Sequence, residues 1–280
     1  MINEAVKYYS LNELWKNIKK LSPKRRYIAG GSDIVISHHY DDLNTDLLVD
    51  ISDIKELNIV KETSDSVFIG AAVKISEFKK NNIIKRYIPA LYECVDYYAS
   101  PSVRNIATLG GNLVNSSPCA DGVLALVASG ARVVRNLYGK QKLSDIFDVI
   151  IGPKKTSLKK DELIEGFIVP KWEHRAVFLK MMPRKIFGIS KAGLCVCANL
   201  KGNLFKDIRI SASSVGPAVI DCKKTSRFLT DKDITNDIIN KAKDIISCEI
   251  SPIDDHRSTA DYRREITAVF LQRAIEKFVV

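Results

Sequence analysis

The 280-residue sequence predicts an α+β fold in two parts. Three features support this fold class. The first half alternates short apolar segments with helical stripes, and residues 152–175 are rich in Lys, Gly and Pro, as is typical of a domain boundary. Beyond that stretch, strand patterns come first and helical patterns last, which is typical of an α+β domain whose antiparallel sheet is covered by helices on one face.

The first half contains both strand and helix patterns. Ser10 and Glu13 fit a capping box that opens a helix over residues 11–18. Apolar runs between turn residues predict strands at 26–29, 47–51, 67–71 and 131–134. Helical spacing predicts helices at 75–80, 86–99 and 120–129, and Pro101 is expected to end the second of them.

The second half follows the boundary stretch, which closes at Trp172. Strands are predicted at 176–182, 191–200 and 206–215, and helices at 233–247 and 258–278. Ser258 or Thr259 is expected to cap the last helix. We therefore place two domains at residues 1–172 and 173–280.

The composition excludes several classes of protein. The chain has 43 Lys and Arg against 33 Asp and Glu, a net charge of +10. These charges are spread along both halves, whereas a nucleic-acid-binding surface concentrates them, so we expect no nucleic-acid partner. No apolar stretch approaches the roughly 20 residues that span a bilayer, and the N-terminus lacks a secretory pattern. We expect a cytoplasmic protein with no membrane contact.

Six cysteines form no C-x-x-C pair, and four histidines offer little for metal binding. Cys195 and Cys197 would face the same side of a strand, where they would pack as small hydrophobic residues. We therefore predict free, buried cysteines and no metal site.

Two glycine pairs are the strongest candidates for a binding site. Each follows an apolar segment, in residues 27–33 and in residues 106–112. Glycine permits positive φ, and successive N–H groups in such turns form anion-binding sites. Two such loops would hold one diphosphate from two sides. Either loop alone would be an ordinary turn, and neither has the spacing of a dinucleotide-binding Rossmann motif or a P-loop.

Taken together, these motifs resemble the FAD-binding medium subunit of the molybdenum hydroxylases, the xanthine dehydrogenase and carbon monoxide dehydrogenase group. Ala29-Gly30-Gly31-Ser32-Asp33 matches A-G-G-[ST]-D, and residues 104–112 match R-N-x-A-T-[ILV]-G-G-N. Asn115-Ser116-Ser117-Pro118 with Asp121 matches N-x-[SA]-P-x-x-D. Weaker matches occur at residues 49–51, 69–71, 161–164, 178–184 and 257–263, so the resemblance covers almost the whole chain in order.

The resemblance implies a two-part FAD-binding domain of the vanillyl-alcohol-oxidase (PCMH-like) type over residues 1–172, split near 55–60. Residues 173–280 would be a smaller α+β domain that resembles the C-terminal domain of the CO dehydrogenase flavoprotein. Leu124 and Phe178 depart from the family, which often has Pro and usually Tyr there. No cysteine-bearing insertion occurs, so we expect no iron–sulfur cluster in this subunit.

The resemblance also implies which residues contact noncovalently bound FAD. The first loop and its entering strand would wrap the diphosphate and ribityl region through backbone N–H groups, and the second loop would contact the diphosphate from the other side. These two sets are Arg26, Tyr27, Ile28, Ala29, Gly30, Gly31, Ser32 and Asp33, and Thr108, Leu109, Gly110, Gly111 and Asn112.

Three further residues are implied singly, each with an alternative. Asp121 would accept a hydrogen bond from a ribityl or ribose hydroxyl, or would cap a helix. Ile164 would lie against the adenine or flavin, or would be a core residue. Lys180 would reach toward the flavin, or would be a surface lysine. No catalytic side chain and no metal ligand are expected.

The function implied is electron transfer in a xanthine dehydrogenase-like complex. Electrons would pass from [2Fe-2S] clusters on a small subunit through FAD to NAD, while a large subunit carries the molybdopterin centre. Family members usually form a dimer of heterotrimers. An alternative within the same class is a complex that oxidises carbon monoxide, nicotine or another heterocycle. Alternatives of other classes are a self-contained flavin oxidase and a basic nucleic-acid-binding or interaction protein.

Overall fold

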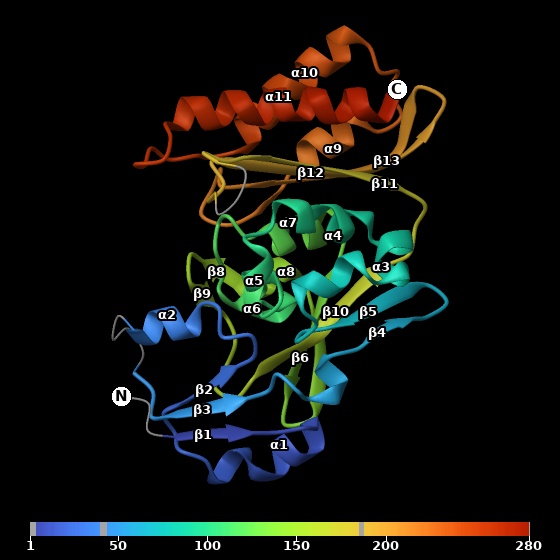
Figure 1. Ribbon diagram of the computed structural model, residues 1–280. Coiled ribbons are helices and arrows are strands. Elements are labelled where there is room, and N and C mark those ends of the chain that lie inside the picture. The colour runs from blue at the N-terminus through green and yellow to red at the C-terminus, as the bar shows by residue number, and fades with distance from the viewer. Residues whose placement is uncertain (1–3, 40–43, 185–187, 280) are drawn as a thin grey trace.

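The computed structural model describes residues 4–39, 44–184 and 188–279 (Figure 1). The chain forms three units that follow one another along the long axis of the molecule, from the N-terminal sheet through a central sheet with its helices to the C-terminal domain. The predicted α+β fold class is confirmed, because each unit combines strands with helices.

The first subdomain, which comprises the described residues from 4 to 57, is built on a parallel three-stranded sheet. Its strands are β1 (Glu4–Lys7), β3 (Leu47–Asp50) and β2 (Arg25–Ile28), in that order. Helix α1 (Leu11–Asn17) precedes β2, and α2 (Ile34–His39) follows it. The Ser10 hydroxyl accepts a hydrogen bond from the Glu13 N–H at 3.2 Å, so the predicted cap of α1 is confirmed.

The second subdomain, residues 58–172, is built on an antiparallel five-stranded sheet. In order across the sheet, its strands are β4 (Val60–Glu62), β5 (Ser66–Gly70), β10 (Leu163–Pro170), β6 (Arg132–Leu137) and β7 (Lys140–Ser144). The helices between this sheet and the C-terminal domain are α3 (Asn82–Tyr87), α4 (Pro89–Cys94), α5 (Pro101–Arg104), α6 (Leu109–Val114), α7 (Asp121–Ala128) and α8 (Ile146–Val149). The hairpin of β8 (Ile150–Gly152) and β9 (Lys155–Thr156) lies beside them.

Two sequence predictions in this subdomain were wrong in detail. The helix expected over 86–99 is interrupted at Ile88, where φ is −136°, because the following Pro89 disfavours a helical residue before it. The stretch taken as a boundary, 152–175, contains the central strand β10. Glu165 and Gly166 break the apolar run of β10, and burial on both faces removes the alternation that identifies a strand.

The C-terminal domain has an antiparallel sheet of four strands, β11 (Arg175–Met181), β12 (Ala192–Lys201), β13 (Leu204–Ser213) and β14 (Ile220–Asp221). Helices α9 (Lys223–Leu229), α10 (Asn236–Glu249) and α11 (Ala260–Val279) cover one face (Figure 1). The other face packs on α4 and α7, so both faces are covered, whereas the sequence predicted one. Residues 192–198 are buried throughout for this reason.

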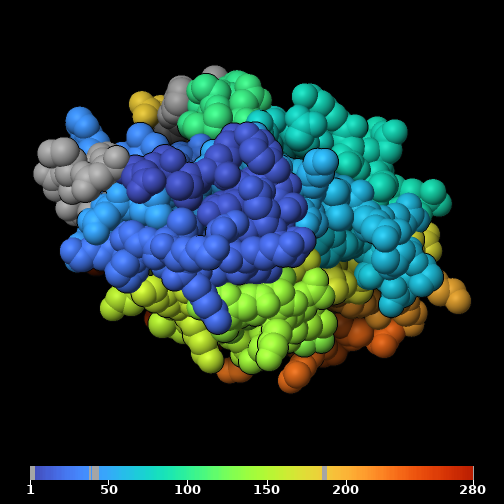
Figure 2. Space-filling model, turned by 90° about the horizontal axis from the view of Figure 1, so that it is seen from below, coloured from blue at the N-terminus to red at the C-terminus, as the bar shows by residue number. Residues whose placement is uncertain are grey.

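The two subdomains of the N-terminal half lie directly against each other. Figure 2 shows the first subdomain, in blue, packed on the yellow-green segment that includes β7 and β9. The rings of Trp15 from α1 and Tyr138 from the β6–β7 turn meet edge to face at 5.9 Å. A cavity lies between the two subdomains at the end of β2.

Candidate functional site

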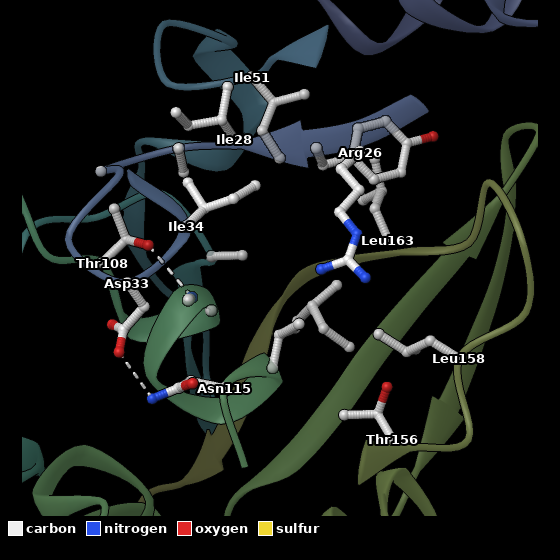
Figure 3. A pocket seen from close by; sticks show the side chains of 18 of the residues that line it. Arg26, Ile28, Asp33, Ile34, Ile51, Thr108, Asn115, Thr156, Leu158 and Leu163 are labelled. Carbon is white, nitrogen blue, oxygen red and sulfur yellow. Dashed lines mark hydrogen bonds between the residues drawn. The ribbon is translucent and has the colours of Figure 1, made fainter. Parts of the chain in front are cut away.

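The cavity between the subdomains has a volume of about 680 Å³ (Figure 3). Most of the residues predicted to bind a cofactor line it, although the two groups come from distant parts of the sequence. They are Arg26, Tyr27, Ile28, Ala29, Gly30, Gly31, Ser32, Asp33, Thr108, Gly110, Gly111 and Ile164. A volume of this size is within the range of small-molecule and cofactor sites.

Four residues of the predicted site do not line this cavity. Leu109 is fully buried in the core of the second subdomain. Asn112 points toward Tyr98, whose hydroxyl accepts a hydrogen bond from Asn112 Nδ2 at 3.1 Å. Asp121 and Lys180 form a separate buried pair. The structure therefore divides the predicted residues into a cavity group and an interior group, which consists of Leu109 and Asn112 on α6 and the Asp121–Lys180 pair behind that helix.

The first glycine motif forms an open turn between β2 and α2. Gly31 has a φ of +73°, which glycine adopts without steric cost. In the described part of the chain, no acceptor bonds the backbone N–H groups of Gly30, Gly31, Ser32 or Asp33. Since unbonded N–H groups in sequence form anion-binding sites, this turn is suited to a phosphate or diphosphate.

The second glycine motif is not the turn that the sequence predicted. Thr108 caps helix α6, and its Oγ1 accepts a hydrogen bond from the Gly111 N–H at 3.1 Å. The N–H groups of Leu109 and Gly110 donate to the carbonyls of Val73 and Ala71, at 3.2 and 2.8 Å. The amides at the start of α6 are therefore already bonded, and this motif supplies a wall of the cavity without free amides.

The two motifs touch each other. A Cβ on Gly30 would lie 1.7 Å from the carbonyl oxygen of Ile106, so only glycine lets the first turn pack on the segment before α6. Asn115 at the end of α6 donates from Nδ2 to Asp33 Oδ1 at 2.9 Å (Figure 3). The two segments, joined by residues 82 positions apart in sequence, thus form one side of a single cavity.

The free charges at the cavity are mostly positive. Arg26, whose side chain extends into the cavity in Figure 3, has no ion-pair partner among the described residues. The same holds for three exposed lysines that the sequence reasoning missed, Lys154, Lys159 and Lys160. The only uncompensated carboxylate in this part of the described chain is Asp33. An anionic ligand is therefore favoured.

The residues present fit FAD, which carries a diphosphate between two aromatic ring systems. Unbonded amides and free cations would receive the diphosphate, and the cavity wall between them is apolar. Ile28, Ile51 and Leu163 supply part of that wall (Figure 3). Ile164, buried to 4% exposure, lies both in the core and at the cavity, so its two sequence readings are compatible.

Behind α6, Lys180 Nζ lies 2.6 Å from Asp121 Oδ2, and the two side chains are 4% and 9% exposed. Lys180 also donates to the Tyr97 carbonyl at 3.1 Å, whereas Asp121 Oδ1 has no hydrogen-bond partner in the described structure. Burial raises the pKa of Asp121 above its ordinary value, and the Lys180 charge opposes that rise. The helix-cap alternative for Asp121 was wrong, because Ala120 is the N-cap of α7. The surface alternative for Lys180 was also wrong, because its side chain is buried.

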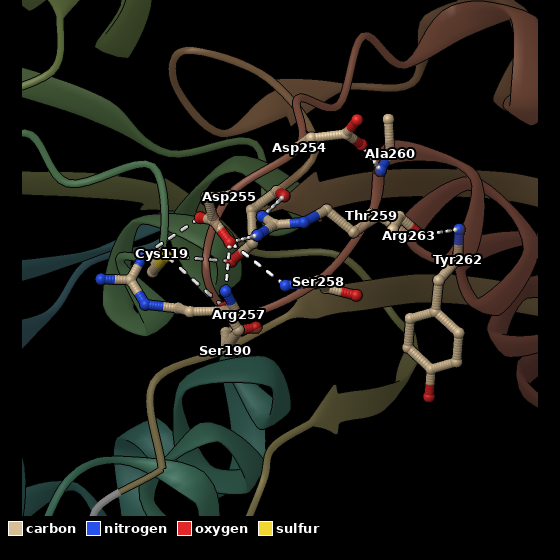
Figure 4. A network of polar contacts seen from close by, with 11 residues as sticks. Cys119, Ser190, Asp254, Asp255, Arg257, Ser258, Thr259, Ala260, Tyr262 and Arg263 are labelled. Atoms are coloured by element: carbon tan, nitrogen blue, oxygen red, sulfur yellow. Dashed lines mark hydrogen bonds and ion pairs between the residues drawn. The ribbon is translucent and has the colours of Figure 1, made fainter.

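The C-terminal family motif has a structural role away from the cavity (Figure 4). The Asp255 carboxylate accepts hydrogen bonds from the Arg257 N–H at 2.8 Å and from Arg263 Nη2 at 2.6 Å. Arg263 Nη1 donates to the Ser214 carbonyl at 2.8 Å. Ser214 in turn donates from Oγ to Cys119 Sγ at 3.0 Å, so the motif joins α11 to the loop before α7.

Neither a metal centre nor a membrane-spanning helix is found within residues 4–39, 44–184 and 188–279. No three His, Cys, Asp or Glu side chains of these ranges gather as metal ligands would. None of their helices combines the length and apolar character needed to cross a bilayer.

Comparison with known proteins agrees with the sequence motifs. Residues 4–172 match the family model described as the FAD binding domain in molybdopterin dehydrogenase. Residues 177–278 match the CO dehydrogenase flavoprotein C-terminal domain.

Individual relatives cover nearly the whole chain. The glyceraldehyde dehydrogenase medium chain of Sulfolobus acidocaldarius is 26% identical over 99% of this chain and 95% of its own length. The xanthine dehydrogenase FAD-binding subunit of Escherichia coli O157:H7 is 24% identical over 94% and 91%. A solved carbon monoxide dehydrogenase from Hydrogenophaga pseudoflava superposes with a TM-score of 0.92 at 23% identity, covering 99% of this chain and 96% of that chain. The chain therefore belongs to the family of FAD-binding domains in molybdopterin dehydrogenases, and it is a flavoprotein subunit of the molybdenum hydroxylase family, as the motifs predicted.

Proposed function

We propose that this chain is the electron-transfer subunit of a xanthine dehydrogenase-like molybdenum hydroxylase and that its cavity binds FAD without a covalent bond. The observation that carries the proposal is the turn from Gly30 to Asp33. Its N–H groups have no acceptor among the described residues, and it lies at a cavity where several cations have no ion-pair partner among those residues. An anionic dinucleotide satisfies those groups, and none of them is needed for the fold itself.

The predicted residues then have different tasks. The turn at residues 30–33 binds the diphosphate through its amides, and Arg26 adds positive charge from β2. Gly111 keeps the adjoining wall free of a side chain, Gly110 lets α6 pack on Ala71, and Ile164 supplies an apolar contact to a ring. Leu109 positions α6 by packing in the core. These roles orient the cofactor and exclude water from it.

Bound FAD supplies the exchange between single-electron and hydride transfer. This chain binds the cofactor and sets its electrostatic surroundings, and we assign it no general acid or base. We propose that Asn112 on α6 and the Asp121–Lys180 pair behind that helix act on the flavin end of the cofactor. Lys180 would shift the flavin redox potential through its charge. Replacing Lys180 should then shift that potential in protein that retains FAD.

The partners follow from the proposed chemistry. We propose a large subunit with molybdopterin, a small subunit with [2Fe-2S] clusters, NAD as the final acceptor and a cytoplasmic dimer of heterotrimers. Residues 1–172 would be the FAD-binding domain, divided near 55–60, and residues 173–280 the C-terminal domain. The change of sheet supports that division, because β3 (Leu47–Asp50) belongs to the first sheet and β4, which begins at Val60, belongs to the second.

The substrate is a separate question, because the large subunit would select it. The relative named for glyceraldehyde is 26% identical to this chain and the one named for xanthine is 24% identical, so an aldehyde is a specific second candidate. Purified complex should be assayed with xanthine, glyceraldehyde, carbon monoxide and nicotinate, with NAD as acceptor. Xanthine turnover supports our proposal, and turnover of another substrate alone rejects the xanthine assignment.

FAD binding is tested most directly on the cavity lysines. In a triple variant with Lys154, Lys159 and Lys160 changed to Gln, the dissociation constant for FAD should rise about tenfold or more. A control with Lys201, Lys224 and Lys277 changed to Gln removes the same charge from exposed positions elsewhere. Titration followed by flavin absorbance near ~450 nm measures both. Equal effects in the two triples, or no FAD binding by the unmodified chain, would contradict the proposal.

A further inference from the structure

Asp161 joins the two subdomains at one edge of the cavity. Its carboxylate accepts two hydrogen bonds from Arg25 on β2, from Nε to Oδ1 at 2.9 Å and from Nη2 to Oδ2 at 2.7 Å. Its carbonyl accepts a hydrogen bond from the Tyr27 hydroxyl at 2.9 Å. The Tyr138 hydroxyl donates to Oδ2 at 2.8 Å. Arg25 and Tyr27 of the first subdomain and Tyr138 of the second thus meet at Asp161.

This contact is buried and geometrically specific. The side chains of Arg25 and Asp161 are 8% and 6% exposed, and the paired hydrogen bonds fix both planes. Burial, and then the Asp161 charge, raises the pKa of Tyr27, so its hydroxyl stays protonated and can donate. A pair this well buried breaks only at a substantial cost.

A second buried ion pair nearby differs from the Asp161 contact because it does not join the two subdomains. Glu162 pairs with Arg135 at 2.7 Å with similar burial, but both residues belong to the second subdomain. That pair also holds Ser157 and the Lys159 N–H, so it fixes the local fold of the segment. Among the described residues, Asp161 is the one member of this segment that forms an ion pair with the first subdomain.

The segment held in this way carries the cavity lysines. Residues 154–162, which we name the strap, run from β9 toward β10 and line the cavity with Lys154, Lys159 and Lys160. Asp161 has a φ of +66°, and Tyr138 has a φ of +53°. Non-glycine residues adopt such values at a cost, and these conformations concentrate at functional sites.

We propose that Arg25 and Asp161 form a clasp that closes the strap and the first subdomain around the bound cofactor, so that release of FAD requires the clasp to open. The inference rests on the proposed function. It assigns Arg25, Asp161 and Tyr138 as positioning residues, which act through the strap lysines and the turn at 30–33. The clasp fixes the distance between those cations and the amides that face them.

The test measures FAD release from the full chain by the fluorescence of freed flavin. Asp161→Asn keeps the size of the side chain and tolerates the left-handed backbone, but it removes the charge. We expect the release rate to rise about tenfold or more. Arg25→Met should have a similar effect, and the double variant should release FAD no faster than the faster single variant, because the same contact is lost once.

Asp255→Asn is the matched control, since it breaks an ion pair with a buried arginine, Arg263, and neither residue lines the cavity. It should lower the thermal midpoint while leaving FAD release within about threefold of the unmodified rate. If Asp161→Asn releases FAD no faster than this control, the clasp is wrong, although FAD binding itself stands.

A second measurement does not depend on FAD. The chain has two tryptophans, so Trp172→Phe leaves Trp15, which packs on Tyr138, as the one reporter. Adding Asp161→Asn should shift the Trp15 emission to longer wavelength, because the subdomain contact loosens. An unchanged emission overturns the clasp. A chain that shows the emission shift but never binds FAD would support the contact between the subdomains. It would reject the proposed function, and the role of the clasp in FAD release would be rejected with it.

Discussion

The two glycine motifs have similar sequences but different structural roles. In the first, the N–H groups from Gly30 to Asp33 have no acceptor within the ranges that the structure describes, and Gly31 has positive φ. In the second, Thr108 caps a helix and every amide from Leu109 to Asn112 has an acceptor. One motif exposes its backbone to the cavity, and the other uses glycine for close packing.

Neighbouring side chains account for the difference. Thr108 Oγ1 turns back to its own helix and bonds Gly111. Ser32 instead donates to Asp33 Oδ2 at 3.2 Å, and Asp33 accepts from Asn115 on α6, so neither caps the amides of its own turn. A polar residue beside a glycine pair thus binds a ligand or closes a helix, depending on which partner it finds. This contrast is the basis of the predictions below.

The largest effect is expected at Gly30. In Gly30→Ala the new Cβ would lie 1.7 Å from the Ile106 carbonyl oxygen, which is backbone and cannot rotate away. The two motifs must then separate, and the free energy of unfolding should fall by about 4–5 kcal/mol. Chemical denaturation measures this loss. A stable Gly30→Ala protein with full FAD content would show that the motifs need not touch.

Breaking the buried Asp121–Lys180 pair behind α6 should lower the stability of the fold more than it lowers FAD retention. Lys180→Met leaves Asp121 buried without its counter-charge, and about 3 kcal/mol of stability should be lost. The pKa of Asp121, already raised by burial, should rise further. A carboxyl whose folded pKa is raised stabilises the fold only at low pH, and that stability is lost as pH rises through the folded value.

Thermal unfolding between pH 4.5 and 8 checks the sign of this effect. The Lys180→Met midpoint should fall with rising pH more steeply than that of the unmodified chain. Adding Asp121→Asn removes the buried charge, so the double variant should recover stability at pH 8. A single variant whose midpoint rises with pH would show that Asp121 ionises freely in the fold.

A substitution at Gly111 distinguishes the effect on FAD binding from the effect on folding. Its new Cβ would approach only Thr108 Oγ1, at 2.9 Å, and otherwise faces the cavity. Gly111→Val should therefore cost about 2 kcal/mol through the disturbed cap, while the chain stays folded and loses FAD. Circular dichroism and flavin stoichiometry measure the two effects. Normal flavin content would mean that the cofactor does not approach this wall.

The sequence predicted most of the elements that position the site. The strand before the first glycine pair, the cap at Ser10 and the C-terminal order of strands and helices are all present. These features depend on local patterns such as apolar runs and capping side chains, and the family motifs placed both sides of the cavity.

What the sequence missed depends on contacts between distant segments. Lys154, Lys159 and Lys160 looked like a linker, because a lysine-rich stretch gives no sign that it lines a cavity. The pair of Asp121 and Lys180 joins α7 to β11 across 59 residues, and no spacing rule predicts it. The helical state of the second glycine pair was hidden because two adjacent glycines disfavour a helix, and packing of Gly110 on Ala71 overrides that preference.

The smallest effect is expected at Gly31, where it isolates the role of the open turn. Gly31→Ala forces a side chain into φ +73°, which should cost about 1 kcal/mol without a backbone clash. Gly202→Ala is the matched control, because Gly202 has a φ of +60° and nothing within 4 Å of a new Cβ. Both variants should lose similar stability in denaturation, but only Gly31→Ala should weaken FAD binding, since only its turn presents free amides. Equal FAD affinity in the two variants would mean that the exact course of the turn backbone is unimportant, and the contrast between the motifs would then lie in packing alone.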